Sequence, residues 1–169
     1  MRIGGSGLVA ADLIPSGAGT MRNMDLVSER DGVLISPFAN SASLASNFSC
    51  VQLLNASASG RRLLVDGIIM KGGATVSVQL RSHNTALSTD EGAWGSINPP
   101  ATAANAHVFS ERVSSLPGDL IVQYPKHSVI ATKYWTLTYP IMLDEDEGLV
   151  ICQIAVQMGM NAAFIGREV

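Results

Sequence analysis

Residues 134–157 read YWTLTYPIMLDEDEGLVICQIAVQ, and this stretch decides the fold. Two runs rich in β-branched, aliphatic and aromatic residues, 134–143 and 149–157, flank a short acidic segment that ends in glycine. Two such runs joined by a short polar loop containing glycine predict a β-hairpin. The stretch contains no metal-binding, cofactor-binding or catalytic motif, so it indicates architecture rather than chemistry.

The chain after residue 47 continues this pattern of short apolar runs separated by turn residues. Val76, Val78 and Leu80 alternate with polar residues, which is typical of a half-buried strand. Glycine and proline signal turns at 72–73 and 116–119. The predicted strands are 48–54, 61–71, 75–81, 107–113, 120–124, 134–143, 149–157 and 162–169, with a long loop at 83–105. Many strands without an amphipathic helix predict an all-β fold, an antiparallel, jelly-roll-like β-sandwich.

Residues 1–47 differ in composition from the β-sandwich domain predicted at 48–169. They are rich in Gly, Ala and Ser and carry few large apolar side chains, which is typical of an arm or linker. We therefore predict an extended N-terminal arm that contacts neighbouring subunits. The predicted partner-contact residues are Met21, Met24 and Phe38 of this arm and Trp94 of the long loop.

The chain is poor in charge. Charged residues make up 15% and hydrophobic residues 47%, against roughly 25% charged in an ordinary globular protein. Such a surface is either covered by uncharged polar residues or buried against other subunits, and we favour a homo-oligomer, with a trimer as one option. The net charge of −3 argues against a nucleic-acid partner. No apolar run has the length of a membrane helix and no signal peptide is recognisable, so we expect synthesis in a cytoplasm and no membrane partner.

The two cysteines, Cys50 and Cys152, lie in separate apolar runs. The default prediction is a pair of buried thiols in a reducing compartment. A disulfide requires the two strands to be neighbours with Cα atoms within about 7 Å, and the sequence leaves that pairing open.

The residues able to bind a metal or catalyse a reaction are mainly carboxylates and histidines. The segment 144–147 (DEDE) has the oxygens that Ca²⁺ prefers, but consecutive residues of an extended tip point in alternating directions. We interpret it as a solvated hairpin tip whose charge discourages edge-to-edge aggregation. His83, His107 and His127 lack zinc-site spacing, and Gly-x-Ser-x-Gly is absent. The prediction is therefore no enzyme, no cofactor, no metal and no catalytic residue.

Trp94 has two interpretations. An exposed ring in a glycine-containing loop could contact a sugar or a partner subunit, whereas a ring folded inward would fill the space beneath its own loop. The first interpretation makes a glycan- or receptor-binding module, such as a bacterial carbohydrate-binding domain, an alternative function.

Three segments carry a family resemblance. They are LLNASASGRRLLVD at 53–66, VQLRSHNTAL at 78–87 and YPIMLDEDEGLV at 139–150. This series resembles small β-sandwich structural proteins of tailed bacteriophages, over about residues 48–169. The resemblance implies a virion protein, either on the capsid shell or in the tail. From the low charge, the small-residue arm and the strand-only body we predict a decoration or cement protein of the capsid, with a tail or fibre component as the alternative. The implied partners are the major capsid protein or tail proteins, and the resemblance supplies no catalytic residues.

Overall fold

The computed structural model describes residues 34–35, 39–41, 48–72, 75–96, 106–128, 132–154 and 159–169. These residues form strands and connecting turns, and none of them belongs to a helix long and apolar enough to cross a membrane. The strands are β2 (Leu34–Ile35), β3 (Ala39–Ser41), β4 (Phe48–Asn55), β5 (Leu63–Gly72), β6 (Thr75–Ser82), β7 (Thr89–Ala93), β8 (Gly95–Ser96), β9 (Ala106–Val113), β10 (Asp119–Ser128), β11 (Lys133–Leu143), β12 (Gly148–Ile154) and β13 (Met160–Glu168).

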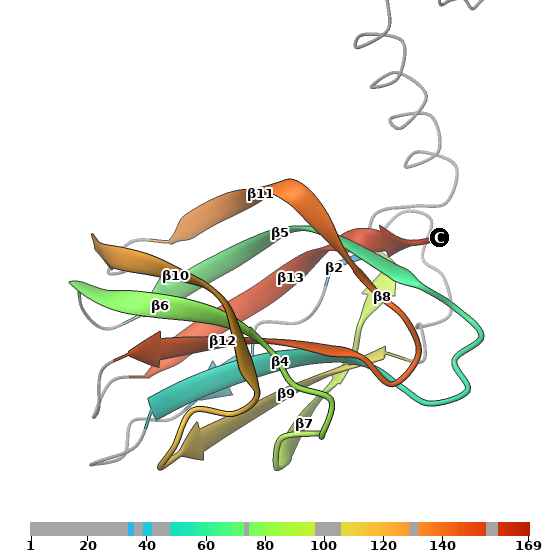
Figure 1. Cartoon of the computed structure of the whole chain (residues 1–169), viewed down its shortest axis with the longest axis horizontal. Coiled ribbons are helices and arrows are strands. Elements are labelled where there is room, and N and C mark those ends of the chain that lie inside the picture. Colours follow the sequence, from blue (N-terminus) through green and yellow to red (C-terminus); the bar gives the residue numbers. More distant parts are fainter. Residues whose placement is uncertain are drawn as a thin grey trace, which may run out of the picture.

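The strands form two sheets that pack face to face (Figure 1). The β4 sheet has the order β10-β6-β12-β4-β9-β7, and the β5 sheet has the order β11-β5-β13-β2-β8, with β3 also paired to β13. Every pair formed by these described strands is antiparallel. The predicted all-β antiparallel sandwich is confirmed.

The jelly-roll character lies in the nesting of the strand pairs. β4 pairs with β12, β5 with β11, β6 with β10 and β7 with β9, so outer strands of the sequence enclose inner ones. A long hairpin folded onto itself produces this pattern, and alternate pairs fall into alternate sheets of a jelly roll. One departure is that the β7–β9 pair joins β4 in the same sheet. Another is β13, which adds to β5 as an extra strand.

The core fills the space between the sheets, and strand alternation decides which side chains enter it. Val78 and Leu80 of β6 are 0% and 1% exposed, whereas Gln79 and Arg81 are half-buried, as the alternation predicts. The side chain of Val76 is not described. The core side chains are Val51, Leu53, Leu63, Val65, Ile68, Met70, Val78, Leu80, Trp94, Ala106, Val108, Leu137, Leu143, Leu149, Ile151, Met160, Ala162 and Phe164.

Two predictions about chain organisation need adjustment. Residues 34–35 and 39–41 of the predicted arm form β2 and β3, which pair with β13, so this part belongs to the sandwich. The rest of 1–47 lies outside the described residues. The predicted loop at 83–105 contains β7 and β8, which the sequence pattern missed because Thr89–Ala93 has two acidic residues, a glycine and no apolar alternation.

Candidate functional site

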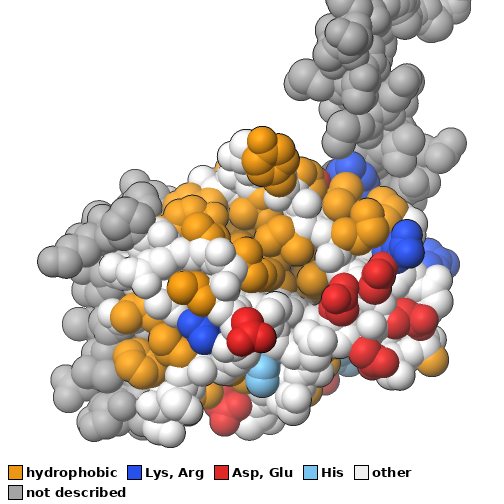
Figure 2. All heavy atoms as spheres, in the orientation of Figure 1, with side chains coloured by type: hydrophobic (Ala, Val, Ile, Leu, Met, Phe, Trp, Pro, Cys, Tyr) orange, Lys and Arg blue, Asp and Glu red, His pale blue; other side chains and the backbone are white. Residues whose placement is uncertain are grey.

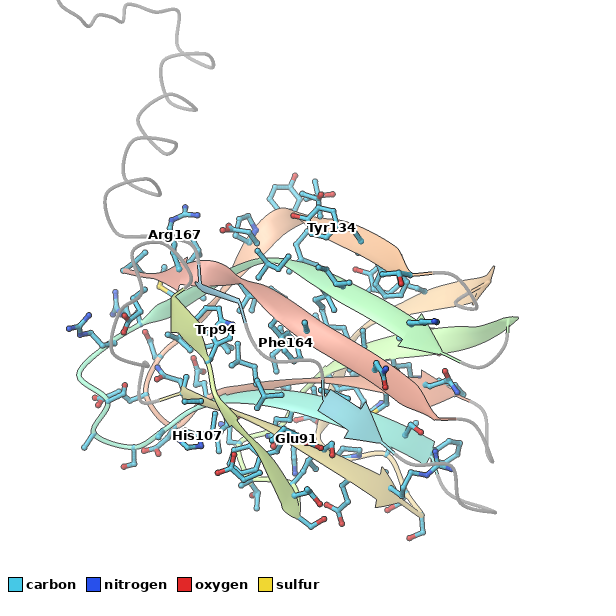
Figure 3. The ribbon with its side chains drawn as sticks, turned by 180° about the vertical axis from the view of Figure 1, so that it is seen from behind. Glu91, Trp94, His107, Tyr134, Phe164 and Arg167 are labelled. Carbon is cyan, nitrogen blue, oxygen red and sulfur yellow. A yellow bond between two sulfur atoms is a disulfide. The ribbon has the colours of Figure 1, made fainter. Side chains whose placement is uncertain are left out.

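Trp94 is a core residue rather than a surface contact. Its side chain is fully buried, and its indole Nε1 donates a hydrogen bond of 3.0 Å to the carbonyl oxygen of Phe164 on β13. Figure 3 shows the two side chains side by side between the sheets. The predicted partner contact at Trp94 is therefore wrong, and the alternative interpretation as an inward-folded ring is confirmed. The reason is that Trp94 connects β7 of one sheet to β8 of the other, so its ring turns into the space between them. Met21, Met24 and Phe38 lie outside the described residues.

A different surface collects the large exposed hydrophobic side chains. Leu120 and Ile121 of β10 are 52% and 48% exposed. Tyr134, Tyr139 and Met142 of β11 are 55%, 84% and 46% exposed. We call these five residues the apolar side. Figure 2 shows hydrophobic side chains gathered over β10, β11 and the space between them.

The topology explains this exposure, because β10 and β11 are edge strands of different sheets. β10 pairs only with β6 and β11 only with β5 among the described strands, so the two strands border one open side of the sandwich. The rings of Tyr124 and Trp135 meet across this opening with centroids 4.5 Å apart. The side chains that fill the opening are only partly buried, and they are Val122, Tyr124, Trp135 and Ile141.

Both edge strands are irregular. Along β11, Thr136 pairs with Gly67 and Ile141 with Val65, so the segment 137–140 stands opposite the single residue 66. Leu137 of this bulge turns into the core, whereas Tyr139 is 84% exposed. β10 has register shifts on both sides of the segment 122–124. Each strand also contains a proline, which has no N–H to donate to a further strand. Bulges and prolines blunt an edge against strand addition, so a partner at this side would dock mainly through side chains.

Tyr134 is positioned by a glycine on the neighbouring strand. A Cβ atom placed on Gly67 would lie 2.9 Å from Cε2 of Tyr134 and 3.0 Å from the carbonyl oxygen of Trp135. The tyrosine ring therefore lies directly over the bare backbone of β5. Beside it, Asp66 accepts a 2.6 Å hydrogen bond from Nη1 of Arg167. Burial raises the pKa of the Asp66 carboxyl, and the Arg167 charge partly opposes that rise. Figure 3 places Tyr134 and Arg167 on the same outer part of the β5 sheet.

A charged end adjoins the apolar side where β11 stops. It consists of two loops and the end of β13, and its ionisable residues are Arg61, Arg62, Asp144, Glu145, Asp146, Glu147 and Glu168. An open hollow of about 460 Å³ lies at this end, and it is lined by Gly60, Arg61, Arg62, Asp144, Glu145 and Val169. Asn55 holds the two loops together, because its Nδ2 donates to the carbonyl oxygens of Arg61 and Asp144 at 2.8 and 3.0 Å.

The acidic segment is solvated, as predicted, but it is not the tip of a hairpin. β11 pairs with β5, whereas β12 pairs with β4 and β6, so residues 144–147 cross from one sheet to the other and the predicted hairpin over 134–157 is wrong. The two runs are strands, but the nested pairing gives each of them partners from elsewhere in the chain. All four side chains of 144–147 are exposed. Asp144 pairs with Nε of Arg62 at 2.7 Å, Glu145 accepts from the backbone of Gly60 at 2.9 Å, and Glu147 accepts from the backbone of its own turn at 2.8 Å. These carboxylates thus engage different groups instead of converging. Within the described ranges, no cluster of three or more histidine, cysteine or acidic side chains has the arrangement of a metal site.

The cysteines form a disulfide bond. Cys50 and Cys152 are directly opposed on β4 and β12, with Cα atoms 4.2 Å apart, and both are fully buried. The prediction of buried cysteines is confirmed, but the prediction of free thiols is wrong. The physical reason is the nested pairing, which brings strands 102 residues apart into contact. A loop also packs on this outer face of the β4 sheet, where Leu87 contacts the cysteine cluster and donates its N–H to Gln52 at 2.9 Å.

Polar groups gather at the opposite edge of the β4 sheet. Nδ1 of His107 lies 2.8 Å from Asp90, and Ser110 donates to Glu91 (Figure 3 labels His107 and Glu91). Burial works to raise the pKa of Asp90, but the Gly92 N–H and His107 lower it by more, so the pKa of Asp90 lies below its usual value. The structure does not bring His83 to this pair, and the side chain of His127 is not described.

The sequence did carry one signal for the apolar side. Pro140 stands inside the predicted strand 134–143 and Pro125 directly follows the predicted strand 120–124, and a proline in or beside such a run marks an edge strand. No protein-family model matches this chain, and no curated protein or solved structure matches it.

Proposed function

We propose that this chain is a non-enzymatic structural protein of a tailed-bacteriophage virion that decorates or cements the capsid shell. The observation that carries the proposal is the apolar side, because exposed apolar surface rimmed by polar residues marks an interaction site. Its side chains are 46–84% exposed in the isolated chain. A second protein packed over β10 and β11 would remove them from water.

Other properties agree with an assembly role. The charged fraction of 15% is low for a protein that is fully exposed to water. The buried disulfide suits a particle that works outside the cell, since disulfides persist in oxidising surroundings. The resemblance of three segments to small phage β-sandwich proteins points to the same class. Many copies, each with a modest contact, would stabilise a shell through multivalency.

The alternative within the virion is a tail or fibre component, which the apolar side supports equally. The glycan- or receptor-binding alternative depended on an exposed Trp94. Since that ring is fully buried, no observation favours this alternative.

Location on the particle tests the proposal. Particles of the phage that encodes this chain would be purified on a density gradient. Mass spectrometry would identify their proteins, and immunogold electron microscopy would locate this protein on the particle. We expect the protein to co-sediment with particles in many copies and the gold label to lie on the shell. Label confined to the tail would select the alternative. Recovery of the protein only from the soluble fraction of the lysate would contradict a virion role altogether.

A further inference from the structure

The end of the molecule next to the apolar side has an excess of negative charge. Its ionisable side chains comprise two arginines and five carboxylates, so this charged end carries −3 at neutral pH. Met142 of the apolar side is separated from Asp144 by a single residue. Figure 2 shows the acidic and basic side chains gathered beside the hydrophobic ones on the same face. A partner that covers the apolar side therefore meets a negative rim.

The arginines that the structure describes already have partners within the chain. Arg61 pairs with Glu168 at 3.4 Å, and Arg62 with Asp144 at 2.7 Å. Of the other three, Arg81 donates to the carbonyl oxygen of Pro117, Arg112 to Ser49 and Arg167 to Asp66. Lys71 of β5 is exposed, and Lys126 and Lys133 belong to β10 and β11, where their side chains are not described. Among the side chains that the structure describes, no basic cluster would complement the charged end of a second copy.

We propose that the apolar side binds an apolar segment flanked by basic side chains, contributed by a different protein of the assembly. The inference rests on the proposed structural function and names the chemistry of its partner. Tyr139 is the central anchor, because it is 84% exposed on a bulge and large aromatic residues dominate interface energetics. The basic side chains of the segment lie against the charged end, and electrostatic complementarity selects its direction.

Synthetic peptides provide the test, and Trp135 provides the signal. The full-length protein would be titrated with a Leu/Lys peptide, a Leu/Glu peptide of the same length and a Gly/Lys peptide without apolar residues. Trp135 is partly exposed beside the apolar side, whereas Trp94 is buried and gives a constant background. We expect the fluorescence to shift to shorter wavelength with Leu/Lys and the dissociation constant to be at least tenfold lower than for either other peptide. Raising the salt concentration should weaken binding.

Two variants identify the site. Tyr139→Asp combined with Met142→Asp should weaken Leu/Lys binding at least tenfold, whereas Thr89→Asp, on the opposite edge of the β4 sheet, should not change it. All three residues are exposed, so near-ultraviolet circular dichroism should confirm that both variants are folded. Glu145→Gln combined with Asp146→Asn should weaken binding several-fold by removing two charges from the rim.

Each contrary result has a distinct meaning. Equal affinity for Leu/Lys and Leu/Glu peptides would overturn the charge argument. Leu/Lys binding that survives the Tyr139/Met142 change would overturn the site. Self-association in sedimentation equilibrium that this change abolishes would make a second copy the occupant and refute a different protein. Absence of the protein from virions, with peptide binding intact, would instead remove the proposed function and leave the binding chemistry standing.

Discussion

Removal of the Cys50–Cys152 disulfide should lower the stability of the sandwich by several kcal/mol. The bond links strands 102 residues apart in the chain. In the chain-entropy description, closing a loop of that length lowers the conformational entropy of the unfolded state, which destabilises that state by about 4.7 kcal/mol. Measured disulfides typically contribute about 2–4 kcal/mol to the free energy of unfolding. With a urea dependence of about 2 kcal/mol per molar, the unfolding midpoint should fall by about 1–2 M.

The assay compares three samples by urea unfolding, followed by circular dichroism. They are the oxidised protein, the same protein reduced in urea and refolded with a phosphine reductant, and Cys50→Ala combined with Cys152→Ala. The two samples without the bond should unfold at similar urea concentrations, well below the oxidised protein, and differ only by the lost packing of the sulfur atoms. Because both cysteines are fully buried, the native protein should resist the reductant until it opens.

Two results would refute this reasoning. Alkylation of two thiols in denatured protein that never met a reductant would show that the bond does not form. Equal urea midpoints of the oxidised and reduced protein would show that the disulfide adds nothing to the stability of the fold.

Three further changes test other parts of the structure. Gln52→Leu should cost about 1–3 kcal/mol, because the buried N–H of Leu87 loses its acceptor, and hydrogen exchange at that amide should accelerate. Gly67→Ala should lower the melting temperature by an amount that corresponds to about 1–3 kcal/mol, because the new Cβ would lie 2.9 Å from a tyrosine ring; an unchanged melting temperature would show that the ring moves freely. Arg167→Met should destabilise the protein less at about pH 4 than at about pH 7. Burial raises the pKa of Asp66 in the folded state, and loss of the arginine charge raises that pKa further. A carboxyl whose folded pKa is raised lowers the stability of the folded protein as the pH rises through that pKa. Urea midpoints of wild type and variant that differ equally at both pH values would contradict that linkage.

Local sequence patterns were sufficient for most strands. The run at 134–143 became β11 (Lys133–Leu143), and the alternation around Val78 became β6 with the expected faces. The alternation of a strand involves only neighbouring residues, so it can be recognised in a single sequence. Thr89–Ala93 lacks that periodicity, and its pairing with β9 depends on partners that only the folded chain provides.

The candidate site depended on topology, which is not local. Cys50 and Cys152 meet only because the strand pairs nest, and Trp94 is buried only because the chain crosses between sheets there. The hydrophobic residues of β10 and β11 resemble core residues in sequence. Their exposure follows from the edge positions of these strands, and the prolines within them were the local hint.

Hydroxyl-radical footprinting of the protein, free and bound in purified particles, tests most directly whether the apolar side is the surface of assembly. Tyr139 and Met142 are 84% and 46% exposed in the free chain and should oxidise readily there. We predict that their oxidation rates fall at least fivefold in the particle, while the half-buried Phe109 on the outer face of the β4 sheet keeps its rate and the buried Trp94 stays unreactive in both states. Undiminished oxidation of Tyr139 and Met142 in the particle would contradict the account and assign assembly to another surface.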